Sequence, residues 1–192
     1  MKDTTIKLTV PDSWNQVTIK QYQLIINLKK TTSINIISIL TNQDEEIIKS
    51  LDINTITNII NHLNWTNTLD IKEVYKPIIK IDNKEYGFIS KLTSLTVGEW
   101  IDLEHYIGDL NNNIHNIFSI LYKPLITAYS DTDRLLENTN NDETQRRAEL
   151  FKEKAMIGDL YGALVFFCLI VKESTTTIQD FLTQEIAKMQ MK

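Results

Sequence analysis

The stretch IGDLYGALVFFCLIVK, residues 157–172, decides how this chain folds. It is apolar on almost every side from Leu160 to Val171, and a helix of that composition has no face suited to water, so it must be enclosed. At about 1.5 Å per residue it is too short to cross a bilayer, which takes roughly 20 apolar residues. We therefore predict a buried core helix, on which Gly158 and Gly162 let a neighbouring segment approach closely.

The totals favour one compact, non-secreted domain. The chain has 192 residues, which fits a single domain over 1–192. Its formal net charge is −5 and its basic residues are spread along the chain, whereas nucleic-acid binders carry a basic patch. We expect no nucleic-acid partner and no membrane span. The single cysteine, Cys168, lies in the core stretch, where we expect it to be a buried small hydrophobe in a reducing cytoplasm.

Helical periodicity and capping residues predict a set of short helices around this core. Thr18 is suited to cap a helix over 19–29, and Thr96, with Glu99 three residues later, one over 97–107. Pro124 should end the helix that carries Ile114, Ile117 and Phe118 near Tyr122. Ser33 and Asp44 are predicted to cap two further helices, and others are predicted to begin at Asn54 or Thr55, at Glu143 and at Thr177.

A small antiparallel sheet completes the predicted fold. Residues 5–10 alternate with a period of two, and 76–81 and 85–89 are two β-rich runs around a polar turn. Because an isolated hairpin is marginal in water, we expect it to pair with the N-terminal strand. The fold class is therefore α+β, mostly α: a helical bundle around a buried C-terminal apolar helix. The polar residues 129–143 are predicted to be a mobile segment that orders on a partner.

The sequence contains no recognisable constellation for catalysis. It has no phosphate-binding glycine loop, no nucleophile elbow and no dinucleotide fingerprint. Asp102 and His105 have the spacing of carboxylate-bridged metal bundles, but a second copy of that motif is missing. We predict no enzyme, no catalytic, cofactor-binding or metal site, and no cofactor. A metal-dependent enzyme built on Asp102, Glu104 and His105 stays the rival hypothesis.

Partner contact is the remaining class of function. Tryptophan is enriched at interface hot spots, and Trp14 stands in a polar stretch, so it is open between core and contact. Trp100, at an apolar periodic position, is predicted to be core. The residues that we expect to bind partners are Trp14, Tyr22, Arg134, Arg146 and Arg147.

Six segments resemble a family of small proteins of tailed bacteriophages, including crAss-like phages of Bacteroidales hosts. They are VPDSWNQVTIKQY at 10–22, SILT at 38–41, LTVGEWIDLE at 95–104, ILYKPLI at 120–126, RAELF at 147–151 and GALVFF at 162–167. The resemblance implies a product of the head-tail structural gene block: a virion component of the neck, tail or packaged cargo, made in the host cytoplasm. Its partners would be other phage structural proteins, with a homo-oligomer possible. Alternatives are a tail assembly chaperone absent from the mature virion and a host cytoplasmic adaptor.

Overall fold

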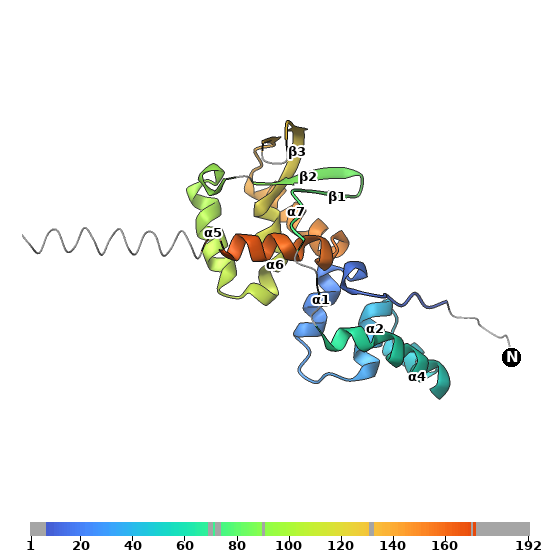
Figure 1. Cartoon of the computed structure of the whole chain (residues 1–192). Coiled ribbons are helices and arrows are strands. Elements are labelled where there is room, and N and C mark those ends of the chain that lie inside the picture. The colour runs from blue at the N-terminus through green and yellow to red at the C-terminus, as the bar shows by residue number, and fades with distance from the viewer. Residues whose placement is uncertain are drawn as a thin grey trace, which may run out of the picture.

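The computed structural model describes residues 7–68, 71, 74–89, 91–130, 133–169 and 171 (Figure 1). A last helix over 157–169 is called the apolar helix below. The α-helices that precede it are α1 (Ile19–Ile26), α2 (Ser33–Thr41), α3 (Glu45–Lys49), α4 (Ile53–His62), α5 (Val97–Ile107), α6 (Leu110–Leu121) and α7 (Asn141–Lys154). The strands are β1 (Ile78–Ile81), β2 (Lys84–Phe88), β3 (Tyr122–Ala128) and β4 (Arg134–Leu136). The mostly helical α+β class is confirmed.

Local capping sets where the helices begin, as predicted. Thr18 and Thr96 each form a complete capping box, in which the threonine accepts from the third helical backbone N–H and that residue's side chain bonds back. Asp44 is at the N-cap position of α3, as predicted, but its side chain makes no capping hydrogen bond. The cap of α2 is Thr32, which accepts from the Asn35 N–H, and not Ser33. The fourth helix begins slightly earlier than predicted, because Asp52 accepts from the backbone N–H groups of Asn54 and Thr55.

The sheet is antiparallel with strand order β1-β2-β3-β4. The predicted hairpin is confirmed: β1 and β2 are joined through Asp82 and Asn83, which both have a positive φ, as tight hairpin turns require. The N-terminal strand is wrong for residues 7–10, which form no strand, and residues 5–6 lie outside the described residues. The third strand is β3 instead, since α6 ends at Leu121 and the chain continues as a strand through Pro124.

The segment over 129–143, which is predicted to be mobile, contains regular secondary structure. Arg134–Leu136 is a strand paired with β3, and Asn140 caps α7 by accepting from the Glu143 backbone N–H. The cross-strand hydrogen bonds and the capping box satisfy backbone groups that the polar composition alone suggested would be solvated. Residues 131 and 132 lie outside the described residues.

The apolar helix is enclosed on one side only, which corrects the prediction of complete burial. Ile157, Leu160, Ala163 and Phe167 are fully buried, with the spacing of a single helix face. Phe166, Leu169 and Cys168 are exposed instead. Cys168 is therefore not a core residue, although its apolar surroundings shield the thiol enough to raise its pKa.

At two glycines of the apolar helix the backbone of another segment packs directly against the helix, as predicted. A Cβ at Gly162 would overlap the carbonyl of Val74 and lie 2.7 Å from the Tyr75 nitrogen. A Cβ at Gly158 would lie 2.8 Å from the Cα of Asn15. The backbone segments that precede β1 and α1 thus both pack directly against this helix.

Helix α1 joins two groups of helices. Figure 1 shows α1 between the α2 and α4 region and the part that holds the sheet, α5, α6 and α7. The Ile19 N–H donates to the Ala155 carbonyl at 3.0 Å, and the Ile157 N–H donates to the Val17 carbonyl at 2.9 Å. The Gln21 amide donates to the Ile39 carbonyl at 3.0 Å, whereas the Gln23 amide donates to the Asn111 carbonyl at 2.9 Å. Each side of α1 is therefore tied to a different group.

Replacing Gly162 tests the close packing on the apolar helix. Gly162→Ala should lower the free energy of unfolding by about 2–4 kcal/mol, because a methyl group there must displace backbone rather than a side chain. Gly98→Ala on α5 is the matched control: its Cβ would lie 3.9 Å from the Thr96 hydroxyl, an ordinary contact, and the gain in helix propensity should raise stability by about 0.5 kcal/mol. Urea denaturation measures both, and equal stability of the two variants would contradict the packing.

Candidate protein-contact surfaces

Trp14 and Tyr22 pack inside the chain. Trp14 is 5% exposed, donates its indole N–H to the Thr68 carbonyl at 3.0 Å, and lies edge-on to Trp65 with ring centroids 5.2 Å apart. Tyr22 is also buried, and the centroid of its ring lies 5.7 Å from that of Trp14. The question left open for Trp14 is answered in favour of the core, since its ring presents little surface to a partner.

The two neighbouring arginines of α7 have different surroundings. Arg147 is 5% exposed and donates to the Ser119 carbonyl at 2.8 Å and to the hydroxyls of Thr139 and Thr144 at 3.1 and 3.2 Å. Burial lowers the pKa of its guanidinium. Arg146 is exposed. Arg147 thus fastens the start of α7 to α6, and Arg146 is the one of the pair that is free to meet a partner.

Because their surroundings differ, the same substitution is predicted to destabilise the fold at Arg147 and to have little effect at Arg146. Arg147→Lys should lower the free energy of unfolding by about 2–3 kcal/mol, because one ammonium cannot satisfy three separated acceptors in a buried site. Arg146→Lys should change it by less than about 0.5 kcal/mol. Thermal melts of both variants measure this, and a stable Arg147→Lys would show that the buried hydrogen bonds contribute little.

Arg134 lies at a polar cavity of about 600 Å³ between β4 and the segment that leads into α5. Its guanidinium donates to the Phe88 carbonyl at 3.1 Å. A Cβ on Gly87 would meet the side chains of Arg134 and Leu136, so the glycine lets both lie across β2. The cavity is lined by Ile89, Lys91, Ser94, Lys123, Asp133, Arg134, Leu136, Glu137 and Asn138. Its mixture of both charges suits hydrogen bonding to a polar partner segment better than binding of an anion.

A shielded ion pair joins the wall of this cavity to α5. The Lys123 ammonium lies 2.6 Å from a Glu99 carboxylate oxygen, and the two side chains are 8% and 14% exposed. Burial acts to raise the pKa of Glu99, but hydrogen bonds from Lys123 and Thr96 and the lysine's charge outweigh it and lower the pKa. Lys123 was not among the predicted site residues. The available signal was a lone lysine inside an apolar run.

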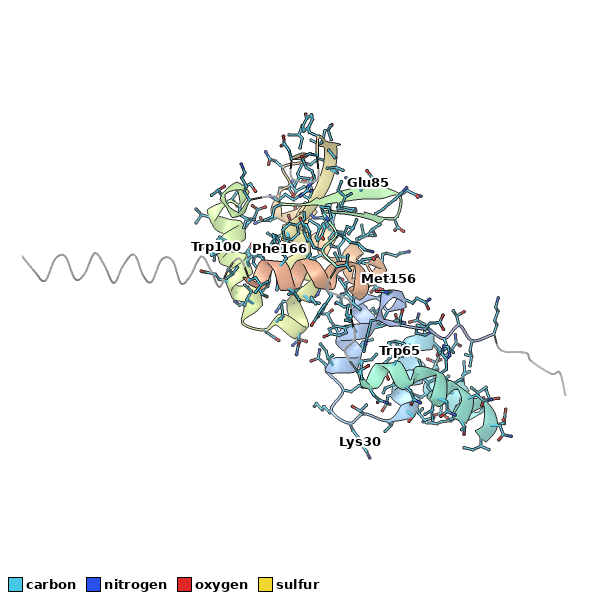
Figure 2. The ribbon with its side chains drawn as sticks, in the orientation of Figure 1. Lys30, Trp65, Glu85, Trp100, Met156 and Phe166 are labelled. Carbon is cyan, nitrogen blue, oxygen red and sulfur yellow. The ribbon has the colours of Figure 1, made fainter. Side chains whose placement is uncertain are left out.

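The outer face of α5 is apolar and exposed. Val97 is 78% exposed and Ile101 is 58% exposed. Trp100, which is labelled in Figure 2, lies on the same side and is half-buried rather than core. Its indole N–H donates to Glu104 at 2.9 Å. Within this helix the buried residue is Leu103, one turn after Trp100. We call Val97, Trp100 and Ile101 the α5 face.

A second apolar surface is a groove of about 380 Å³ beside the apolar helix. It runs between α1, the start of α6 and the outward side of the apolar helix. Its walls are formed by Tyr22, Leu110, Asn111, Ile114, Tyr161, Leu164, Val165, Cys168 and Leu169. Of the predicted contact residues, Tyr22 therefore lines this groove, Arg134 the polar cavity, and Arg146 the outside of α7.

The residues of the rival metal hypothesis do not converge on a site. Asp102, Glu104 and His105 are all exposed on α5. Within the described ranges, no group of three or more histidine, cysteine or acidic side chains is placed to hold a metal ion.

No helix of the described part of the chain is long and apolar enough to span a bilayer. Comparison with protein-family models, curated proteins and solved structures finds no match.

The ion pair predicts how stability depends on pH. The lowered pKa of Glu99 means that the pair stabilises the fold above the unfolded value of about 4.3, and that this is lost as pH falls through the folded pKa. Lys123→Met should lower the free energy of unfolding at pH 7 by about 1–3 kcal/mol, because Glu99 loses its partner.

The deficit of Lys123→Met should shrink in acid, where Glu99 is protonated in both proteins. Urea denaturation across the acid range measures this. Lys84→Met is the control, since the Lys84 and Glu137 pair is exposed and 3.5 Å apart, and it should change stability by under about 0.5 kcal/mol. A deficit of constant size from pH 7 into acid would argue against the ion pair as its cause.

Proposed function

We propose that this chain is a non-enzymatic structural protein of a phage virion, part of the neck, the tail or the packaged cargo, that acts through protein contacts. The resemblance of six ordered segments to tailed-phage proteins supports the phage assignment. The observation that supports a role in protein contacts is the α5 face, where the large apolar side chains of Val97 and Ile101 are exposed to solvent.

The α5 face has the properties of a contact surface. Single exposed apolar residues are ordinary, but exposed Val97 and Ile101 beside half-buried Trp100 form an apolar patch on one helical face, of the kind that marks interaction sites. The helix beneath is held in place by the Thr96 capping box, buried Leu103 and the Glu99–Lys123 pair. A partner would therefore meet a preorganised surface, and Trp100 provides a residue type that is common at hot spots.

Polar groups outside α5 offer separate contact points. Exposed Arg146 supplies hydrogen-bond donors for a partner's carboxylates or carbonyls, and Arg134 lines the polar cavity. Tyr129 is 68% exposed at the end of β3. Partners would be other phage structural proteins, and a second copy of this chain is one candidate.

Mass spectrometry of purified particles tests the virion role directly. Stoichiometric copies in the particle are expected. Absence from mature particles would favour the assembly chaperone instead, and a stoichiometric bound metal in elemental analysis of the purified protein would favour the enzyme. Either result would overturn the proposal.

A pair of substitutions tests the α5 face. Val97→Gln with Ile101→Gln should reduce incorporation into particles at least tenfold, because about 1.4 kcal/mol of lost binding energy is a factor of ten. The control is Ile53→Gln on α4, which removes an equally exposed apolar residue (75%) far along the chain and should leave incorporation unchanged. Unchanged incorporation of the double variant, with an unchanged melting temperature, would show that another surface makes the contact.

A further inference from the structure

A second polar cavity, of about 240 Å³, lies between strands β2 and β3 and the first half of α7. It has room for about eight water molecules at roughly 30 Å³ each, which is enough for a carboxylate group and the atoms that carry it. Among the residues that line it are Lys84, Tyr86, Glu137, Glu143, Arg146 and Arg147.

The guanidinium of Arg147 is buried at this cavity without a counter-ion. Its three hydrogen bonds go to uncharged oxygens, the Ser119 carbonyl and the hydroxyls of Thr139 and Thr144, and they use Nε and Nη2 alone. Among the described residues no carboxylate forms an ion pair with it, and Nη1 donates to none of them. Because a buried charge is costly without an opposite charge, this guanidinium is suited to receive an anion.

The hydroxyl of Tyr86 is a second donor in the same cavity. Tyr86 is 4% exposed, its ring lies edge-on to Phe151 at 5.0 Å, and its hydroxyl forms no hydrogen bond with any residue that the structure describes. Burial raises the pKa of this hydroxyl, which keeps its proton at neutral pH, and the nearby charge of Arg147 acts in the opposite direction. Buried hydroxyls normally have a partner, so Tyr86 offers its proton to an acceptor inside the cavity.

The charges around the cavity favour a singly charged ligand. Both acidic residues are engaged: Glu137 lies 3.5 Å from the Lys84 ammonium, and Glu143 accepts from the Asn140 N–H at 3.0 Å. Together with exposed Arg146, the lining then carries three cations and two carboxylates, which leaves one net positive charge. A carboxylate neutralises that charge, whereas a phosphate brings an excess of negative charge close to Glu137 and Glu143.

We propose that this cavity binds a carboxylate, which accepts hydrogen bonds from Nη1 of Arg147 and from the Tyr86 hydroxyl. The carboxylate belongs to a small carboxylic acid or to an acidic side chain of a partner protein. The site does not include the α5 face and does not depend on the virion role, so its failure would leave the proposed function untouched.

Acetate is the simplest probe of the site. In ¹⁵N–¹H spectra of the full chain, sodium acetate at constant ionic strength should shift the backbone amides of β2 and of residues 141–147, with half-saturation at roughly 1–20 mM. Sodium phosphate at the same ionic strength should need at least a tenfold higher concentration. Acetate shifts that do not saturate, or phosphate that binds as tightly, would overturn the proposal.

Tyr86→Phe separates a binding role from a structural one. It should weaken acetate binding about tenfold, because a hydrogen bond to a charged group is lost. Its melting temperature without acetate should stay within about 2 °C of wild type, since the hydroxyl has no partner in the fold. The control Tyr129→Phe removes a hydroxyl from a residue that is 68% exposed outside the cavity, and should bind within twofold of wild type. Acetate binding by Tyr86→Phe at wild-type strength would contradict the site.

Two peptides distinguish the sources of the carboxylate. Each is a capped tripeptide, one with a central glutamate and one with a central glutamine between glycines. Saturable shifts of the same amides with the glutamate peptide support the site and identify an acidic side chain of a partner. Binding of acetate without binding of either peptide supports the site and identifies a small carboxylic acid. Equal binding of the two peptides would show that the charge is not recognised and would overturn the proposal.

Discussion

The close approach of backbone to the apolar helix at its two glycines is the constraint on which the other elements depend. Gly162 brings the segment at Val74 and Tyr75 against the helix, and Lys76 forms an ion pair with Asp159 one turn earlier. Tyr75 then contacts both Phe88 of β2 and Phe166, with ring centroids 5.4 and 4.9 Å apart. The position of the hairpin, and so of the whole sheet, follows from a helix surface that has no side chain at these points.

Local signals were enough to predict the helix starts and the β1–β2 hairpin, because the causes of both are local. A capping box such as Thr18 with Gln21 is complete within four residues, and the β1–β2 turn depends on two residues that tolerate a positive φ. Strand β3 was missed because Leu125 continues the helical spacing of α6, and only the missing N–H of Pro124 marks the change. The three residues of β4 carry no signal of their own, since their strand conformation depends on β3.

Which side of an element is buried was predicted less well, because sidedness is a property of the assembled fold. Trp100 and Leu103 are one helical turn apart, and nothing in their spacing indicates which of them faces α6. The same holds for Cys168 and Phe167, adjacent residues with opposite exposure. Charge was equally uninformative: Arg146 and Arg147 differ in burial because only one of them meets the Ser119 carbonyl.

The pairing of Thr18 with Met156 has a consequence for synthesis. The two residues are 138 positions apart, and ribosomes add about 5–20 residues per second, so roughly 7–28 s pass between their appearance. Val17 and Ile19 are fully buried in the folded protein. During that interval they lack the C-terminal neighbours that bury them. The first helices can form early by their own caps, but their docking is timed by translation of the far end.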